Sequence, residues 1–299
     1  RLISALSKTN KSKLTSKQIV SISGVSTAVI VTAARSGILN EELIPRDSPY
    51  PALNPDFKPK KLNLNQINVC ETIKDLQKQN NFSAILLQGV TGSGKTEVYL
   101  EAVANALRKG EQVLVLLPEI ALTSEFFNRV KNRFGENPAE WHSGVTLAER
   151  RRVWKMVASG GAKLVIGARS ALFLPFMNLG LVIVDEEHDH SYKQEDGVIY
   201  NARDMAVLRA SIEMSTVILA SATPSLESWV NAKNGKYNHV QLHERYGEAT
   251  LPNLSAVDLR KENLKSNEWI SNRLEKSIIE CLKNSEQTLL FLNRRGYSP

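Results

Sequence analysis

Two short motifs in this sequence have the residue types and the spacing of a site that binds and hydrolyses a nucleotide. The first is an eight-residue run that lies between an apolar stretch ending at Leu87 and a segment of helical composition: Gly89-Val90-Thr91-Gly92-Ser93-Gly94-Lys95-Thr96. It matches the pattern G-x-x-x-x-G-K-[ST] in the strand-loop-helix context that this pattern requires. Glycines let backbone N–H groups converge on phosphate oxygens, and the start of the following helix adds its partial positive charge. We therefore expect this run to bind ATP, with Lys95 reaching the β and γ phosphates and the Thr96 hydroxyl holding magnesium.

The second motif is acidic and follows the apolar run Leu181-Val-Ile-Val184. It reads Asp185-Glu186-Glu187-His188. We expect Asp185 to hold the magnesium ion, directly or through water, and Glu186 to orient and deprotonate the attacking water. Adjacent carboxylates at the end of a strand could instead form an ordinary solvated loop, but a phosphate-binding loop needs an acidic partner on a neighbouring strand. The two motifs together predict a nucleoside triphosphatase.

The elements that must position these motifs alternate along the chain. Apolar runs without polar alternation predict strands, and segments of helical composition, such as 97–108 and 148–158, separate them. Strands of this kind, spaced by helices, predict an α/β fold with a parallel sheet covered on both faces. Ligands of such sheets bind beyond the carboxyl ends of the strands. The predicted strands span residues 82–87, 112–117, 163–166, 181–184 and 216–220.

The first fifth of the chain is basic and differs from the rest. Six of the seven excess positive charges fall within residues 1–61, which suggests a polyanionic partner for this segment. Short helices at 16–20 and 26–35, joined through Gly24 with Ser26 as N-cap, have the pattern of a helix-turn-helix. Ile38-Leu39 and Glu41-Glu42 would then form a first wing strand. A small helical domain without any nucleic-acid role fits these residues equally well.

Composition narrows the class of protein. A hydrophobic share of 42% and a charged share of 23% are those of an ordinary globular protein rather than a disordered or collagen-like chain. No apolar run approaches the length of a membrane span, and nothing after Arg1 has the pattern of a signal peptide, so we expect a soluble protein that is a piece of something longer. The two cysteines, Cys70 and Cys281, favour a reducing compartment and cannot by themselves form a four-thiolate zinc site.

Nine motifs in order along the chain resemble those of the PriA family of bacterial replication-restart helicases, which belong to helicase superfamily 2. The tetrad at Asp185 has the form D-E-x-H, and Ser221-Ala222-Thr223 resembles the coupling motif of that superfamily. The motifs begin at Gly89, Leu117, His142, Gly167, Asp185, Ser191, Tyr200, Ser221 and Phe291.

The resemblance implies roles for further residues. Gln66 resembles the glutamine that reads adenine, and His188 would join Lys95, Asp185 and Glu186 as a catalytic residue, although a buried structural histidine is an equal alternative. The same resemblance places DNA-binding and coupling functions on Arg169, Tyr192, Lys193, Tyr200, Ser221 and Thr223. Arg203-Asp204 would be a structural ion pair. The triplet Arg150-Arg151-Arg152 fits a solvated helix face better than a DNA patch.

The resemblance also divides the chain into domains. It implies a winged-helix-like DNA-binding domain at 1–44, a proline-rich linker at 45–61 and a RecA-like ATPase lobe at 62–232. A connector at 233–271 and the start of a second RecA-like lobe at 272–299, opening on a strand at 288–291, would follow. The cysteine-rich zinc insertion and the arginine finger of the family would lie outside this piece, which we therefore expect neither to hold zinc nor to unwind DNA alone.

The implied function is that of an ATP-dependent 3′-to-5′ DNA helicase that remodels stalled or abandoned replication forks and initiates primosome assembly. Its partners would be forked and single-stranded DNA, the single-stranded DNA-binding protein and other primosome proteins, without a membrane. The protein would be monomeric and would work in the cytoplasm at the nucleoid. The alternative is a non-catalytic module that binds branched DNA and uses the ATP-binding lobe as a regulatory switch.

Overall fold

The computed structural model describes residues 2–7, 14–40, 49–79, 81–243, 245, 253–262 and 270–291. The chain divides into two compact units, Arg1–Glu244 and Arg245–Pro299. The first unit holds three short amino-terminal helices and an α/β lobe, and each of these parts is described by itself below.

A single seven-stranded sheet forms the centre of the lobe, and all its strand pairs are parallel. The strand order is β3-β4-β2-β5-β8-β1-β9, which places β8 between β5 and β1. The parallel α/β sheet predicted from the apolar runs is therefore confirmed. The strands are β1 (Ser83–Gly89), β2 (Gln112–Leu116), β3 (Ala139–Trp141), β4 (Leu164–Gly167), β5 (Leu179–Asp185), β8 (Thr216–Ser221) and β9 (Asn238–Leu242).

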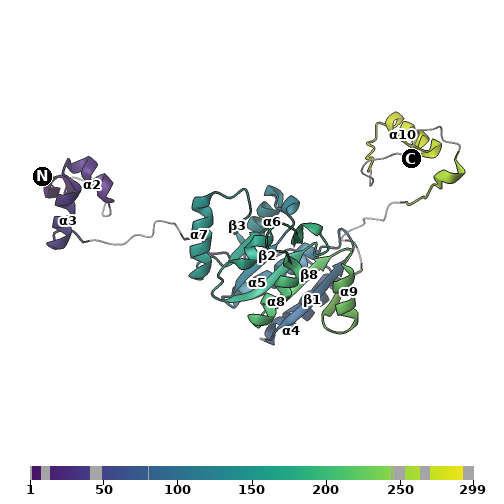
Figure 1. Ribbon diagram of the computed structural model, residues 1–299, viewed down its shortest axis with the longest axis horizontal. Helices are drawn as coiled ribbons and strands as arrows, with labels where there is room; N and C mark the ends of the chain where they lie inside the picture. The colour runs from purple at the N-terminus through teal and green to yellow at the C-terminus, as the bar shows by residue number, and fades with distance from the viewer. Residues whose placement is uncertain are drawn as a thin grey trace. The chain divides into compact units, whose positions relative to one another are not determined.

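Helices cover both faces of this sheet (Figure 1). Residues of alternate parity along the strands point to opposite faces, so Ile85 and Leu87 pack in one core while Ala84 and Leu86 pack in the other. Because both faces are buried, the strands have apolar residues at most positions, which is why they show no polar alternation. Helices α4 (Leu64–Lys78), α5 (Lys95–Arg108) and α6 (Ser124–Phe134) cover the first face, and α7 (Leu147–Ala158), α8 (Ala202–Ile212) and α9 (Leu226–Lys233) the second.

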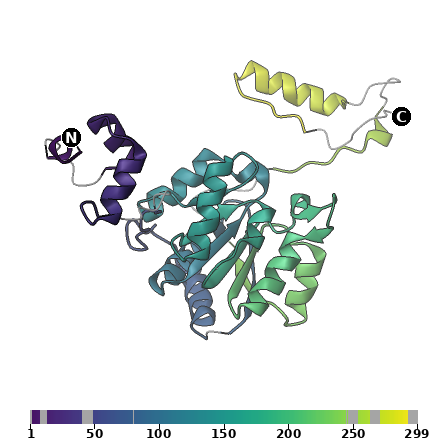
Figure 2. The same cartoon turned by 60° about the vertical axis from the view of Figure 1, so that its left-hand side comes forward.

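Three features of the lobe were not predicted. Strands β3 and β9 are the two outermost strands of the sheet. A separate two-stranded antiparallel hairpin consists of β6 (Lys193–Gln194) and β7 (Tyr200–Asn201) (Figure 2). Because β9 pairs with β1, the sheet continues past residue 232, where we expected the lobe to end. Both edge strands carry few apolar residues, since an edge strand buries only part of its length.

The amino-terminal helices are α1 (Leu2–Leu6), α2 (Ser16–Ser23) and α3 (Thr27–Arg35). Gly24 ends α2 with a φ of 65°, and Ser26 stands at the N-cap of α3, so the predicted helix pair and its turn are present. Ile38-Leu39 form bends rather than the expected wing strand, and Glu41-Glu42 lie outside the described residues. A wing strand needs a hydrogen-bonded partner, and none pairs with 38–40 among the residues that are described.

The described helices contain none that is long and apolar enough by itself to cross a membrane. The bent pair of α2 and α3, with 114° between the two helices, passes that test only when both are taken together.

The second unit contains the helix α10 (Asn272–Lys283), which begins at the N-cap Ser271. Residues 288–291, expected to open a second lobe as a strand, have no strand structure in this unit. An apolar run becomes a strand only where a neighbouring strand shares its backbone hydrogen bonds. The described part of this unit contains no strand that could do so. The rest of the ninth motif, from 292 onward, lies outside the described residues.

Candidate nucleotide-hydrolysis site

The sheet brings three motifs together at the carboxyl ends of its strands. Strands β5, β8 and β1 are neighbours, and they end at Asp185, Ser221 and Gly89. In the register of these parallel strands Asp185 lies beside Ala220, and Gln88 lies beside Ser221. The phosphate-binding run, the acidic tetrad and the Ser221–Thr223 segment therefore leave the sheet side by side.

The loop after β1 has the geometry of a phosphate cradle. Gly92 and Gly94 adopt φ values of 80° and 83°, a left-handed conformation that glycine adopts at little cost. A Cβ atom at Gly89 would lie 2.5 Å from the Ser93 hydroxyl, so the loop closes too tightly for a side chain there. Lys95 is buried, and its Nζ donates to the Gly89 carbonyl oxygen at 3.0 Å.

Ser93 carries an observation that points to an anion. Its hydroxyl is buried inside the loop and has no hydrogen-bond partner among the described residues. A buried hydroxyl without a partner costs free energy unless a ligand or water satisfies it. The residues of the loop, with a donor hydroxyl, a lysine and a helix start, thus fit a triphosphate.

Gln66 lies against this loop rather than on the surface of α4. It is 1% exposed, and both ends of its side-chain amide form hydrogen bonds. Oε1 accepts from the backbone N–H of Asn63 at 3.0 Å, and Nε2 donates to the Ser93 carbonyl oxygen at 2.9 Å. A Cβ at Gly94 would lie 2.3 Å from that Nε2, so Gln66 needs the glycine. Gln66 thus connects α4 to the phosphate loop, and its contact with adenine stays a prediction.

Asp185 is held by two donors. Its Oδ1 accepts from the Glu186 N–H at 3.0 Å and its Oδ2 accepts from the Tyr99 hydroxyl at 2.9 Å. Burial raises the pKa of Asp185, and the neighbouring charge of Glu186 adds to the rise while the Tyr99 hydrogen bond opposes it. A half-buried carboxylate at the end of β5 and the Thr96 hydroxyl, which directly follows the phosphate loop, offer the oxygen ligands that Mg²⁺ prefers. The donor set therefore fits the expected metal.

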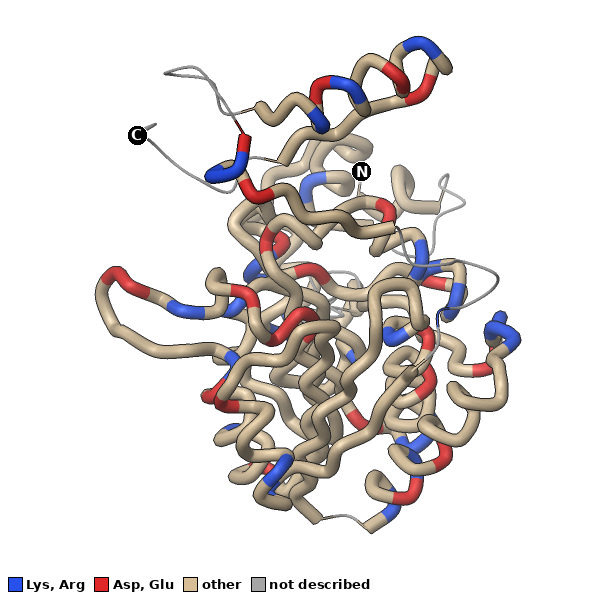
Figure 3. Tube along the Cα trace, turned by 90° about the vertical axis from the view of Figure 1, so that its right-hand side faces the viewer, with Lys and Arg blue, Asp and Glu red and all other residues tan. Residues whose placement is uncertain are grey.

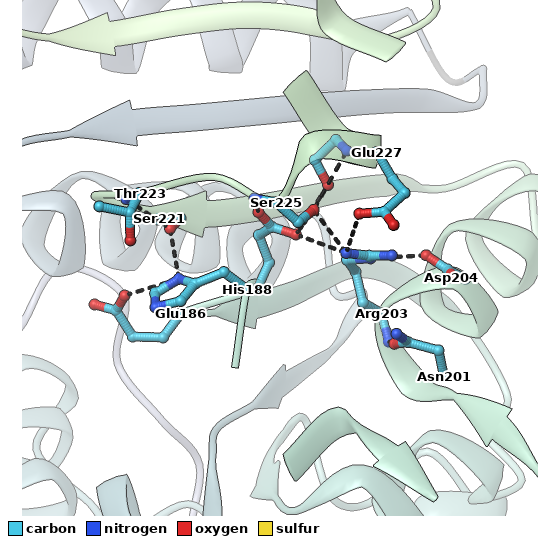
Figure 4. Close-up of polar contacts among 11 residues, drawn as sticks. Glu186, His188, Asn201, Arg203, Asp204, Ser221, Thr223, Ser225 and Glu227 are labelled. Atoms are coloured by element: carbon cyan, nitrogen blue, oxygen red, sulfur yellow. Dashed lines mark hydrogen bonds and ion pairs between the residues drawn. The ribbon is translucent and has the colours of Figure 1, made fainter. Parts of the chain in front are cut away.

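The turn after Asp185 orients the rest of the tetrad. Glu186 has a φ of 46°, a left-handed conformation that is unusual for a residue with a side chain. His188 Nδ1 lies 2.7 Å from the Ser221 hydroxyl and 3.6 Å from a Glu186 oxygen (Figure 4). Ser221 Oγ also accepts from the Thr223 N–H at 3.0 Å. His188 thus links the carboxylate turn to the Ser221–Thr223 segment. Its side chain is exposed rather than buried, and its catalytic role stays a prediction.

Tyr192 differs from its expected role. It is 1% exposed, and its hydroxyl lies 3.0 Å from the Leu116 carbonyl oxygen and 2.6 Å from that of Asp185. A ring in this position joins the ends of β2 and β5 and offers no face to a base. Aromatic side chains beside a lysine suit either core packing or stacking on bases, and the sequence alone does not separate the two.

The other residues expected to contact DNA lie at or near the hairpin. Lys193 is exposed, and its Nζ lies 3.0 Å from Glu195, whereas Tyr200 packs edge-to-face on Phe173 with ring centroids 5.2 Å apart. Arg169 Nη1 donates to the carbonyl oxygens of Ser191 and Lys193, so this arginine anchors the entry to the hairpin. Its contact with a phosphate stays a prediction.

The basic triplet at 150–152 contacts the protein itself. Arg150 donates to the His142 carbonyl oxygen, and Arg152 pairs with Glu149 and lies over the Tyr50 ring. The alternative of a DNA patch therefore finds no support in these two side chains. The ion pair expected between Arg203 and Asp204 is confirmed at 2.7 Å.

Sequence reasoning missed three residues and a cleft. Tyr99 lies one helical turn after Lys95, a spacing that places both on one side of α5, but nothing in its residue type signals a contact with Asp185. Glu187 belongs to the acidic tetrad and Ser225 to the motif that begins at Ser221, but the resemblance to the helicase family implied no role for either residue. A cleft of about 1010 Å³ also opens beside α5 and α6, with Lys61, Glu97 and Arg129 in its wall.

Known proteins are similar to this chain over most of its length. The family model for DEAD/DEAH box helicases matches residues 65–231. The replication restart protein PriA of Rickettsia felis is 46% identical over 251 residues, which cover 81% of this chain and 39% of that protein. PriA of Bacillus subtilis is 39% identical over 289 residues, which cover 96% of this chain and 36% of that protein. The resemblance to the PriA family that the motifs indicated is confirmed, and the chain spans little more than a third of these two relatives.

A crystal structure of the DUF1998 helicase MrfA matches the fold, with a TM-score of 0.51 and 19% sequence identity over 79% of this chain and 36% of that one. At that identity the match concerns the fold alone. The family match covers more than half of the chain and includes the phosphate loop, the acidic tetrad and the Ser221–Thr223 segment. The chain therefore belongs to the DEAD/DEAH box helicase family.

Proposed function

We propose that the complete gene product is an ATP-dependent 3′-to-5′ DNA helicase that recognises and remodels stalled or abandoned replication forks and initiates primosome assembly. The observation that carries the proposal is the meeting of Lys95, Asp185 and Glu186 at one sheet edge, with His188 bonded to Ser221. The names of the similar proteins, replication restart protein PriA in both species, support the fork as the substrate.

The chain's own groups have distinct tasks in hydrolysis. Backbone N–H groups of the phosphate loop, the Ser93 hydroxyl and Lys95 bind the phosphates, while Thr96 and Asp185 hold the magnesium ion. Glu186 accepts the proton of the attacking water. ATP supplies the phosphoanhydride bond whose cleavage drives the protein along DNA. The cleft with Lys61 and Arg129 in its wall receives the nucleoside end, since Lys61 immediately precedes the segment that leads into α4 and Gln66.

DNA contacts belong to the hairpin and to the basic amino-terminal segment. Lys193 and Arg169 neutralise phosphates near the hairpin, whose turn residues 195–199 are exposed. Ser221 and Thr223 relay the state of the nucleotide site, since Ser221 ends β8 and contacts His188, and the Thr223 N–H donates to the Ser221 hydroxyl. Forked and single-stranded DNA, the single-stranded DNA-binding protein and other primosome proteins are the partners, in the cytoplasm at the nucleoid.

Strand displacement tests this proposal. The complete gene product should separate a forked duplex in the presence of Mg-ATP, and it should separate a partial duplex with a 3′ tail in preference to one with a 5′ tail. A Lys95→Ala variant should fold and lose the activity, because it lacks the cation that contacts the β and γ phosphates. If forked DNA were bound but never unwound, a non-catalytic module that binds branched DNA would replace the helicase.

A further inference from the structure

Glu187 is a buried carboxylate to which the hydrolysis mechanism gives no task. Its side chain is fully buried, although it stands between Glu186 and His188. Oε1 accepts from the Ser225 N–H at 2.7 Å, and Oε2 accepts from the hydroxyls of Ser225 and Ser228, each at 2.9 Å. An ionised carboxylate is removed from water only where donors and an opposite charge replace the water.

Arg203 supplies that opposite charge. Its Nη1 lies 3.5 Å from Glu187 Oε2 and donates to Ser225 Oγ at 2.6 Å, while Nε donates to Asp204 at 2.7 Å (Figure 4). Arg203 is 7% exposed, so it cannot move to solvent without breaking this set of bonds. Glu187, Arg203 and Ser225 therefore form one interlocked unit, called the buried triad below.

The buried triad joins three segments of the chain. Glu187 belongs to the turn after β5, and Ser225 is the N-cap of α9, which follows the Ser221–Thr223 segment. Arg203 stands at the start of α8, directly after the hairpin, and Asn201 at the end of β7 accepts its backbone N–H at 3.0 Å. A displacement of the hairpin exit must therefore move Arg203 or break the cap of α8.

The turn that carries Glu186 is held on both sides of that residue. Before it, Asp185 ends β5 in the register of β8. After it, the Glu187 N–H donates to the Ala220 carbonyl oxygen at 3.1 Å, and the Glu187 side chain is held by the buried triad. Glu186 itself has the left-handed φ of 46°, a conformation that persists where surrounding contacts impose it.

We infer that the buried triad is a positioning unit: Arg203 and Ser225 hold Glu187 so that Glu186 is presented to the attacking water, and the unit ties this presentation to the hairpin exit. The inference rests on the proposed ATP hydrolysis. The side chains of Glu187 and Arg203 are buried and bonded to one another's partners, so they act through Glu186.

The test compares ATP turnover and thermal stability in variants of the complete gene product. Arg203→Met should lower kcat by about tenfold or more, because a small misplacement of a reacting group is costly, while the KM for ATP stays within about twofold. Arg203→Lys keeps the charge and should recover part of kcat. Arg209→Met, on the same helix but bonded to Glu213 and the Leu172 carbonyl oxygen, is the matched control and should keep kcat.

A double variant separates positioning from stability. Arg203→Met alone leaves Glu187 buried without its partner charge and should lower Tm, whereas adding Glu187→Gln removes that charge and should restore most of Tm. A positioning role predicts that kcat stays low in the double variant. Recovery of kcat together with Tm would overturn the inference and leave the proposed function intact. A wild-type protein without any turnover would overturn both.

Discussion

At the scale of single residues, Asp185 must be buried beside the phosphate loop and must also stay charged to bind magnesium, and these two requirements oppose each other. Its position at the end of β5 beside the phosphate loop suits a magnesium ligand, but burial there raises its pKa and so disfavours the charged form that binds the metal. The Tyr99 hydroxyl opposes this rise by donating to Oδ2. Tyr99 therefore helps to keep Asp185 ionised and to fix the direction of its carboxylate.

Replacing Tyr99 by phenylalanine tests that role. Tyr99→Phe should lower magnesium-dependent ATP turnover by about tenfold, since the carboxylate loses an orienting donor of the kind whose removal weakens metal sites. Unfolding should become easier by only about 1 kcal/mol, the usual worth of one hydrogen bond. Steady-state kinetics with a magnesium titration provides the measurement, and Tyr237→Phe, a half-buried tyrosine elsewhere, is the control. Unchanged turnover would mean that Tyr99 only fills the core.

Cys70 illustrates the same effect of burial on a different group. Burial, with the charges of Glu101 and Glu71, raises the pKa of the Cys70 thiol to about 12. Because the thiolate is the reactive form, iodoacetamide at pH 8 should label Cys70 far more slowly in the native protein than after unfolding. Since the folded pKa lies above the unfolded value, the contribution of this thiol to stability is full at neutral pH and declines as the pH rises toward 12. Peptide mapping by mass spectrometry measures the labelling in both states, and rapid labelling of the native protein would contradict the partly buried placement of Cys70.

At the scale of elements, the ends of neighbouring strands are held together by side chains from the loops. Tyr192 lies across the carboxyl ends of β2 and β5, and Gln66 connects α4 to the phosphate loop. Both residues had been expected to contact a ligand. The Tyr192 hydroxyl instead bonds backbone carbonyl oxygens, whereas Gln66 bonds the Ser93 carbonyl oxygen and its contact with adenine stays a prediction.

A Tyr192→Phe variant separates the two roles of that residue. Removing the hydroxyl takes away the single O–H donor that two carbonyl oxygens share, so the variant should lose about 1 to 3 kcal/mol of stability. Affinity for single-stranded DNA should stay the same, because the ring is not exposed. Chemical denaturation and fluorescence anisotropy provide the two readouts. Weaker DNA binding at unchanged stability would restore the stacking role.

Two glycines with similar backbones test the link between α4 and the phosphate loop. Gly94 and Gly110 have φ values of 83° and 75°, so alanine at either position should cost about 1 kcal/mol in backbone strain. A Cβ at Gly110 meets nothing within 4 Å, whereas at Gly94 it meets Gln66 Nε2. Gly94→Ala should therefore raise the KM for ATP strongly, and Gly110→Ala should leave it unchanged. Equal KM values for the two variants would show that Gln66 does not shape the loop.

The sequence predicts the elements of the lobe better than it predicts their contacts. Five strands buried on both faces could be recognised because most of their positions are apolar. In contrast, β3 has only Ala139, Glu140 and Trp141, and β9 buries only Val240 and Leu242. The phosphate loop and the acidic tetrad could be predicted because their chemistry dictates residue types at fixed spacing. Contacts such as that of Tyr99 with Asp185 join residues far apart in the chain, and no local pattern marks them.

At the scale of the whole molecule, the charge is unevenly divided. Over the lobe, Lys and Arg are interspersed with Asp and Glu (Figure 3), whereas most of the net positive charge lies within residues 1–61. Of the basic residues in that segment, Lys17, Arg35, Lys58, Lys60 and Lys61 lie in described parts of the chain. A lobe of nearly balanced charge should contribute local contacts to DNA binding, and the basic segment should contribute most of its salt dependence.

The most direct test of the account is the rate of ATP hydrolysis by the complete gene product, measured with and without forked DNA beside the Lys95→Ala variant. The account predicts that forked DNA raises the turnover of the wild-type protein and that the variant shows no turnover in either condition, although it still binds the DNA. Wild-type turnover that is the same with and without forked DNA, or turnover that survives in Lys95→Ala, would contradict it.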